Sequence, residues 1–354
     1  MKRFLLLLAC SSCLFFVKAQ TEVEPFRPGI TENGITYFLP KTKVRVAVTA
    51  VKTHFEPGEF SSYAERFLKL RNVTQTPYDE WKITAVELQP YGVADPTKAY
   101  SIKFKQKTTA PFVTLSKDGR LLAINTQATE EPELIEPSVT KNEEKQVNGA
   151  DYKTEEILSA GSTTKMAELT AAEIYDIREN RGLLTTGQAD FMPADGVQLK
   201  LMLENLDLRE EALLQLFKGT ATSETHVFVF DLEPESSLEK ELLFRFSKFL
   251  GVVDNDDPAG SPVYVSIQDM ETLPAETFEE NAKAKKEPED LRYVLPSRVK
   301  VRIFTDTRDL ASRSFPMAQF GRVEHLGGEL FNKKFTTTLK LSGQTGGIEQ
   351  ITGE

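Results

Sequence analysis

Hydrophobic and polar residues alternate along most of the stretch from residue 35 to residue 126, which is the period of half-buried β-strands. The alternation is clearest at residues 44–49, where valines recur at every second position, and at residues 100–105. Residues 118–119 are Asp-Gly and stand between two apolar runs, which predicts a tight hairpin turn. The region is therefore predicted to form antiparallel β-structure.

Two places in this region depart from the simple strand pattern. The apolar residues of 81–88 lie on one face at the start and on the other at the end, which predicts a bulge near Ala85 or burial on both faces. Apolar residues recur at helical spacing between positions 60 and 70, with Ser61 or Ser62 available as a cap. A single short helix is therefore expected to interrupt the strands.

Residues 127–165 have a different composition. Between positions 130 and 156 there are nine acidic residues and three lysines, a net charge of −6, with only scattered aliphatic side chains. A segment of this kind buries too little apolar surface to offset the entropy lost on ordering. It is predicted to be an acidic linker or a mobile loop.

A helical block is predicted after the acidic segment. Apolar residues at helical spacing predict one helix over 171–184 and a second that begins at the cap Asp195 and runs to residue 205. A third is predicted over 207–218, with Gly219 just beyond its end. The short connections favour a helical hairpin that packs on a sheet.

The last third of the chain returns to the period of two. Residues 226–232 are apolar on both faces, as in a strand that is buried on both sides. Cleaner alternation predicts four further strands, at residues 242–246, 263–267, 299–303 and 335–341. The charged residues 276–290 are expected to form a helix or loop at the surface.

Together these patterns predict an α+β fold of antiparallel, β-rich, sandwich-like domains with a helical hairpin block between them. The predicted division is an N-terminal β domain over 20–126, the acidic linker or loop over 127–165, and a C-terminal α+β domain over 166–354. The patterns leave open whether the two β regions share one core.

The first nineteen residues have the layout of a secretory signal peptide. Lys2 and Arg3 precede an apolar run over 4–17, and Ala19 closes a small-residue cleavage pattern. The run is too short for a membrane-spanning helix, which needs about 20 apolar residues. Cleavage would make Gln20 the first residue of an exported protein, located in the periplasm, at the outer-membrane surface or in the medium.

The leader has an alternative interpretation as that of a lipoprotein. Residues 7–10 fit a lipobox, in which Cys10 would be lipidated and become the N-terminus. However, the chain stays apolar over 14–17, and the apolar segment before Cys10 is shorter than the about 7–15 residues of a signal peptide. Cleavage after Ala19 is therefore preferred.

Composition limits the partners of the exported chain. The net charge is −10, and removal of the three basic residues of the leader makes it −13. An acidic surface repels nucleic acid and anionic lipid headgroups, so neither is an expected partner. No second apolar run long enough to span a bilayer follows Gln20. Both cysteines lie in the leader, so the mature chain has no disulfide, thiolate nucleophile or cysteine metal ligand.

Six short motifs are spread over the mature chain, at residues 26–30, 37–40, 89–92, 177–179, 216–219 and 318–321. These motifs resemble a family of exported Bacteroidetes proteins that is known as a domain of unknown function, number 4831 in that series. The resemblance runs over nearly the full mature length and implies an exported bacterial protein. It implies no activity, substrate or site residue.

Two motifs that could bind or activate a substrate have simpler structural interpretations. Residues 162–165 match the S-x-x-K of penicillin-recognising acyl enzymes, but the accompanying S-x-N and K-T-G motifs are missing, so helix capping is favoured. Arg178 and Arg181 are one helical turn apart and could bind an anion together. Pairing with nearby acidic residues on the helix surface is the favoured interpretation.

Two groups of residues could bind a metal ion. The acidic residues 254–257 suggest a calcium loop, but later positions lack the glycine and the bidentate glutamate of an EF-hand, so a solvated turn is favoured. His54, His226 and His325 are far apart and form no H-E-x-x-H motif. His226 lies on an aromatic strand face and is predicted to be a core histidine with one backbone partner. No metal and no cofactor are therefore expected.

Three functions remain open, and no catalytic residue is assigned, so whether the chain is an enzyme is left open with a preference against it. The favoured hypothesis is a non-catalytic interaction module of the cell envelope or surface, whose partner is another envelope protein that adds to an exposed strand edge. The alternative is a hydrolase of glycan or peptide with a convergent carboxylate pair. A glycan-binding module is less favoured, because Trp81 is the single tryptophan.

Overall fold

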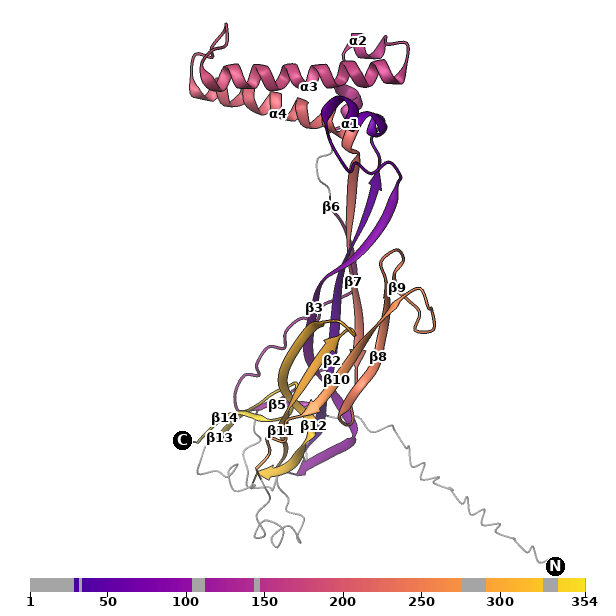
Figure 1. Cartoon of the computed structure of the whole chain (residues 1–354). Coiled ribbons are helices and arrows are strands. Elements are labelled where there is room, and N and C mark those ends of the chain that lie inside the picture. Colours follow the sequence, from indigo (N-terminus) through magenta and orange to yellow (C-terminus); the bar gives the residue numbers. More distant parts are fainter. Residues whose placement is uncertain are drawn as a thin grey trace, which may run out of the picture.

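The computed structural model of the chain describes residues 29–31, 34–103, 112–142, 147–274, 291–326 and 337–353. Three antiparallel sheets and a group of helices make up this part of the chain (Figure 1). The predicted α+β, β-rich fold class is confirmed. The predicted leader over 1–19 and the charged segment 276–290 lie outside the described residues.

Each sheet has its own set of strands. The first sheet has the order β1-β2-β7-β6, with β3 paired along β2 as well, and consists of β1 (Gly29–Thr31), β2 (Gly34–Glu56), β3 (Tyr78–Lys103), β6 (Ser138–Asn142) and β7 (Thr220–Leu232). The second has the order β12-β11-β10-β8-β9 and consists of β8 (Leu238–Ser247), β9 (Gly251–Val253), β10 (Ser261–Asp269), β11 (Leu291–Phe304) and β12 (Asp309–Leu326). The third has the order β14-β13-β5-β4 and consists of β4 (Val113–Leu115), β5 (Leu121–Ile124), β13 (Thr337–Leu341) and β14 (Ile348–Gly353).

Strands from both predicted β regions pair with each other. β2 pairs with β7 over thirteen residue pairs, from Val44 with Leu232 to Glu56 with Thr220. β5 pairs with β13 through Leu339 and Ile124. The two β regions therefore share sheets, which the alternating pattern left open. The boundaries after residues 126 and 165 stay a prediction.

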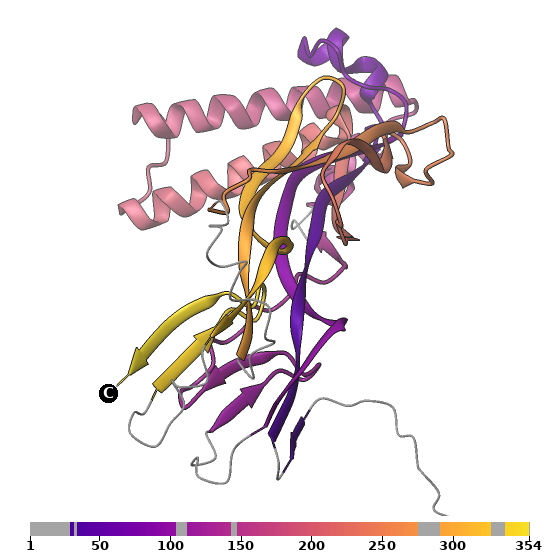
Figure 2. The ribbon, with the colours of Figure 1, turned by 90° about the horizontal axis from the view of Figure 1, so that it is seen from below.

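The first and second sheets pack face to face around a hydrophobic core. Val44, Val46 and Val48 of β2 are fully buried there, and Phe244 and Val301 meet them from the second sheet. A second core lies where the lower ends of the long strands meet the third sheet, whose yellow C-terminal strands are seen in Figure 2. The alternating valines thus face inward, as their period predicts.

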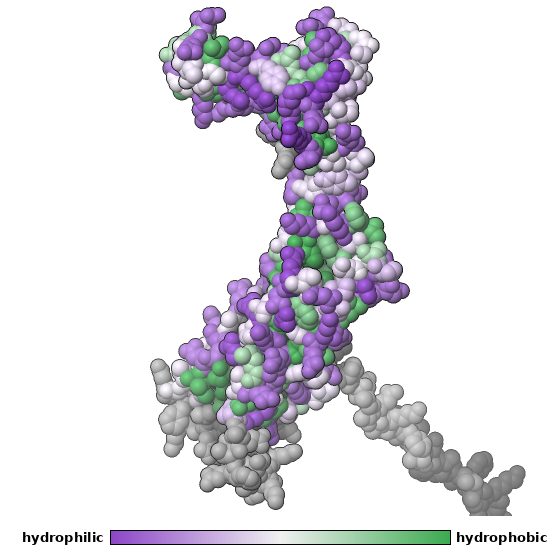
Figure 3. Space-filling view, viewed as in Figure 1, coloured by the Kyte–Doolittle hydropathy of each residue, from purple (hydrophilic) through white to green (hydrophobic). Residues whose placement is uncertain are grey.

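Two very long strands carry the helices away from this sandwich. β2 has 23 residues and β3 has 26, so each would span about 75 Å or more when fully extended. Their upper ends continue with β7 as a narrow ribbon, which forms the waist of the molecule in Figures 1 and 3.

The helices gather at the far end of the ribbon and form what we call the helical head (Figure 1). It consists of η1 (Ser61–Tyr63), α1 (Ala64–Leu68), η2 (Gly149–Tyr152), α2 (Glu155–Leu158), α3 (Thr163–Thr186) and α4 (Gly196–Lys218). Its core is formed by residues of η1, α1, α3, α4 and the loops beside them. The short helix predicted near residue 60 is confirmed, although neither η1 nor α1 has a side-chain cap.

Two details of the predicted helical block are wrong. The helices predicted over 195–205 and 207–218 are one continuous helix, α4, in which the Asn205 side-chain amide donates to the Leu201 carbonyl one turn earlier. The hairpin also does not pack on a sheet, since its inner faces cover each other and α1. The predicted caps at Asp195 and Gly219 are confirmed.

The acidic segment 127–165 contains β6, η2 and α2. Its carboxylates meet cations of the sheets: Glu131 binds Arg120 at 2.7 Å, and Glu136 binds Arg45 at 2.9 Å. Arg120 is only 5% exposed and also binds Asp118. These ion pairs connect residues 131–136 to the sandwich.

Local turn chemistry follows the sequence closely. The Asp-Gly turn joins β4 to β5, with Gly119 at a positive φ of 89°. The β2–β3 register shifts between Thr49 and Ala50, opposite Ala85, which confirms the predicted bulge. No helix within the described ranges combines the length and the apolar composition needed to cross a membrane.

Candidate functional site

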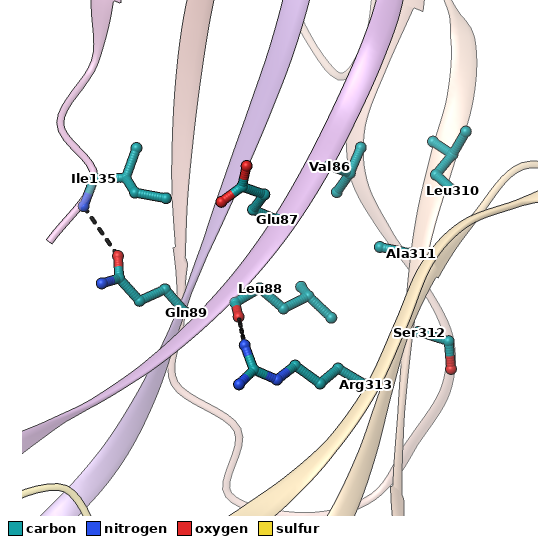
Figure 4. Close-up of a pocket in the computed structure, with 9 residues that line it drawn as sticks. All are labelled: Val86, Glu87, Leu88, Gln89, Ile135, Leu310, Ala311, Ser312 and Arg313. Carbon is teal, nitrogen blue, oxygen red and sulfur yellow. Dashed lines mark hydrogen bonds between the residues drawn. The ribbon is translucent and has the colours of Figure 1, made fainter. Parts of the chain in front are cut away.

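A groove of about 540 Å³ lies between β3 of the first sheet and β12 of the second sheet (Figure 4). Residues of both strands line it, together with one residue of the segment that precedes β6. The lining residues are Val86, Glu87, Leu88, Gln89, Ile135, Leu310, Ala311, Ser312 and Arg313. The groove therefore follows the open side of the sandwich, where the two sheets do not pair.

Side chains cross the groove and hold its walls. Arg313 Nη1 on β12 donates to the Leu88 carbonyl on β3 at 3.1 Å. Gln89 accepts from the Ile135 amide at 2.9 Å and donates to the Glu133 carbonyl at 2.7 Å. The amide group of Gln89 thus pairs with an extended backbone as a neighbouring strand would.

No other strand within the described ranges pairs with the outer edge of β3 or of β12 beside the groove. The Leu88 carbonyl accepts from Arg313, so it points away from β2, and alternation places the backbone groups of Val86 on the same side. On β12 the Pro316 carbonyl accepts from the Gln344 side chain and so points away from β11. Ser312, four residues earlier in an unbroken register, faces the same way. Two strand edges with outward backbone groups therefore lie beside one groove, and Arg313 occupies the Leu88 carbonyl on one of them.

The charges of the groove do not form an acid–base pair. Glu87 is the one carboxylate among its described lining residues. A glycosidase requires two carboxyl groups about 5 to 9 Å apart. The cation, Arg313, bonds to a backbone carbonyl. The groove offers hydrogen bonds and apolar surface, which suit binding better than proton transfer.

The residues of the S-x-x-K motif have a structural role. The Ser162 hydroxyl accepts from the Lys165 amide at 3.3 Å and caps α3. The Lys165 ammonium lies 3.2 Å from Glu168 on the same helix and does not contact the serine hydroxyl. This is the capping interpretation that the sequence favours.

Arg178 and Arg181 form ion pairs inside the helical hairpin. Arg178 contacts Glu210 at 2.6 Å, and Arg181 contacts both Asp207 and Glu210 at 2.6 Å. The carboxylates raise the pKa of the Arg181 guanidinium, chiefly through the hydrogen bond with Asp207. The arginines join α3 to α4 and are not available as an anion clamp.

The acidic residues 254–257 form the turn between β9 and β10. The Asp257 amide donates to the Asp254 carbonyl at 3.0 Å, and the Asp257 carboxylate accepts from the Ala259 amide at 2.8 Å. Across the described residues, no group of three or more His, Cys, Asp or Glu side chains is placed to hold a metal ion.

The three histidines occupy separate places, on β2, β7 and β12. His54 is exposed and contacts Asp79 at 2.7 Å and Glu56 at 3.0 Å. The hydrogen bond with Asp79 is the largest cause that raises the pKa of His54, and the bond with Glu56 is the second. The His226 ring packs against Trp81 with 4.7 Å between centroids. Its Nε2 lies 3.5 Å from the Glu224 carboxylate but makes no hydrogen bond to a described residue, and the predicted backbone partner stays a prediction.

The groove itself was not predicted from the sequence. One signal that could have indicated it is the motif at residues 89–92, which contributes Gln89 to the groove and Pro90 to the same edge. Proline is accepted in a strand only where its missing amide is not needed, typically at an edge. The motif therefore indicates that this strand lies at the edge of a sheet. The opposite wall of the groove, β12, lies more than 200 residues later in the chain.

Comparison with known proteins gives one match. A family model described as a domain of unknown function, DUF4831, matches residues 33–349. The match covers most of the chain and confirms the family suggested by the short motifs; the bacterial lineage and export stay predictions. No curated protein and no solved structure matches the chain.

Proposed function

The chain belongs to the DUF4831 family, whose description assigns no activity, and we propose that it is an exported, non-catalytic interaction module of the cell envelope or surface. Its partner is another envelope protein, which adds an extended segment to the groove between β3 and β12. The leader over 1–19 supports export, and cleavage after Ala19 is preferred to a lipid anchor at Cys10.

The observation that carries this proposal is the pair of open strand edges on either side of one groove. An extended segment can hydrogen-bond to the outward backbone groups of Val86 and Leu88 on one side and of Ser312 on the other. Main-chain bonds of this kind provide affinity, and the side-chain pockets provide sequence preference.

The lining residues define which segments fit. Val86, Leu310 and Ile135 offer apolar contacts, while Glu87 and Arg313 offer one charge of each sign. Because side chains of a strand alternate between two faces, a segment of alternating apolar and polar residues matches the groove. The Leu88 carbonyl must exchange Arg313 for the incoming backbone amide.

Site-specific cross-linking tests this function. The mature chain has no cysteine of its own, so Ser312→Cys introduces a unique attachment point for a photoreactive group at the edge of β12. We expect intact cells to yield one envelope protein, cross-linked through an extended segment. The same label at Thr185→Cys, on the helical hairpin, is the positional control.

A second pair of variants separates edge pairing from other contacts. Ser312→Pro removes an outward amide that binding requires, whereas Ser312→Ala keeps it, and the Ser312 side chain is exposed in either case. Each variant is added without the label as a competitor of the labelled chain. We expect the proline variant to compete poorly for the cross-linked partner and the alanine variant to compete well. Equal competition by both variants, or the same captured proteins from positions 312 and 185, would contradict the proposal.

A further inference from the structure

The helix α4 has a row of exposed apolar residues on the face that points away from α3. Val197, Leu201 and Leu208 are 79%, 58% and 39% exposed. Glu204 and Glu211 lie between and after them and are exposed as well. The steps of four and three residues place all five side chains on one face of the helix. We call these five residues the seam.

The seam lies on a hairpin that is already held together by its other face. Leu213 and Phe217 of α4 are fully buried in the core of the helical head. Arg178 joins the two helices by its ion pair with Glu210. The three aliphatic seam residues belong to none of the hydrophobic clusters formed by the described residues. The hairpin therefore needs no help from the seam in order to fold.

The spacing of the seam is that of a coiled-coil interface. Side chains at steps of four and three residues insert between those of a second helix with the same spacing, and here three of the five positions are apolar and two are glutamates. Phe191 and Met192, in the loop before α4, are exposed as well and lie at the free end of the hairpin, where Figure 3 shows hydrophobic side chains. A rigid helix that exposes such a row loses little entropy when a partner helix binds.

The acidic seam residues decide which helix fits. In an antiparallel pairing of two copies centred on the seam, Glu204 would face Glu204, and like charges in an interface disfavour that pairing. Lys200 lies 3.7 Å from Glu204, but this exposed pair compensates little. Residues 155–218 carry twelve acidic and six basic side chains, a net charge of −6. The charge of the head thus favours a basic partner.

We propose that the seam binds an amphipathic helix of a partner protein, with apolar residues at heptad spacing and lysine or arginine opposite Glu204 and Glu211. This surface is separate from the groove, because the ribbon of β2, β3 and β7 lies between the helical head and the sandwich (Figure 1). The inference does not depend on the groove, and variants of the groove serve as its controls.

The test uses the mature chain from Gln20 and two designed helical peptides of about four heptads with the same leucine seam. One peptide carries lysine beside the seam and the other carries glutamate. Isothermal titration calorimetry should detect binding of the lysine peptide only, and added salt should weaken it. Leu201→Ser should weaken it by about tenfold or more, as expected for an anchor residue.

Charge reversal and matched variants make the test specific. The double variant Glu204→Lys, Glu211→Lys should prefer the glutamate peptide. Leu158→Ser removes another exposed leucine of the head, 62% exposed and outside the seam, and should bind the lysine peptide as wild type does. Arg313→Ala, in the groove, should also bind unchanged. The three seam positions that are changed, Leu201, Glu204 and Glu211, are exposed, so circular dichroism should show unchanged folding.

Three outcomes would overturn the proposal. The first outcome is that neither peptide binds to the wild-type chain, or that both bind to it equally. The second outcome is that the wild-type chain sediments as a dimer and Leu201→Ser sediments as a monomer, which would make the seam a contact between copies. The third outcome is that the wild-type chain floats with phosphatidylcholine vesicles and Leu201→Ser does not, which would make the seam a lipid contact.

Discussion

The hydroxyl of Tyr37 should be a principal link between the two β regions. Tyr37 lies on β2 and is fully buried, and its hydroxyl donates to the Arg292 carbonyl at 2.9 Å and accepts from the Arg292 amide at 2.8 Å. Burial raises the pKa of the Tyr37 phenol well above its usual value, so the group stays neutral. Tyr37→Phe keeps the ring and removes both hydrogen bonds.

The size of the effect follows from the groups left behind. The substitution leaves the amide and the carbonyl of the half-buried Arg292 without these partners, and each such group costs about 1–3 kcal/mol. We therefore expect the free energy of unfolding to fall by about 3 kcal/mol. With a slope of about 3 kcal/mol per M, the urea midpoint would fall by about 1 M.

Urea unfolding followed by far-ultraviolet circular dichroism measures this loss. Tyr100→Phe is the matched control, because its ring lies 6.2 Å from that of Tyr37, is partly exposed, and its hydroxyl has no hydrogen bond to another described residue. The control should change the free energy of unfolding by less than about 0.5 kcal/mol. If Tyr37→Phe changed the free energy of unfolding by as little as the control, the link between β2 and β11 would not be the stabilising contact that its geometry indicates.

Two further predictions concern single side chains. Gly251 has a φ of +78°, and a Cβ there would lie 3.0 Å from the Trp81 ring. Gly251→Ala should therefore lower the free energy of unfolding by about 1–2 kcal/mol and shift the fluorescence emission of the single tryptophan. Unchanged emission would contradict this packing. Asp79 first, and Glu56 second, raise the pKa of His54 above 6.5, so the stabilising contribution of its charge is full below pH 6.5 and is lost as pH rises through the folded-state pKa. In an NMR titration Asp79→Asn should lower that pKa, and an unchanged value would refute the ion pair.

The sequence predicts most of the local structure because local structure depends on near neighbours. The Asp-Gly turn at 118–119, the bulge near Ala85 and the caps Asp195 and Gly219 all follow from backbone preferences within a few residues. The break predicted near residue 206 fails because tertiary packing overrides this local preference. Asn205 disfavours a helix by itself, but the apolar stripe on either side packs against α3 and α1 and keeps α4 continuous.

The candidate site could be predicted only in part. The motif at 89–92 indicates an edge, and the acidic segment supplies the residues that Gln89 holds. The position of the site depends on β12, and nothing in residues 309–326 indicates that this strand lies across from β3. The interpretations of Ser162 and Arg178 as a cap and an ion-pair partner were possible because both contacts lie within one helical hairpin.

The sequence by itself determines most of the long strands and helices and the buried face of each, but not the short elements β6, η2 and α2 or the continuity of α4. A period of two shows that one face of a strand meets a core, but it does not show which strand lies beside it. β2 and β7 are joined across more than 160 residues, and the groove combines residues 86–89 with 310–313. Only tertiary packing decides those neighbours, because the free energy that selects them comes from burying two distant faces against each other.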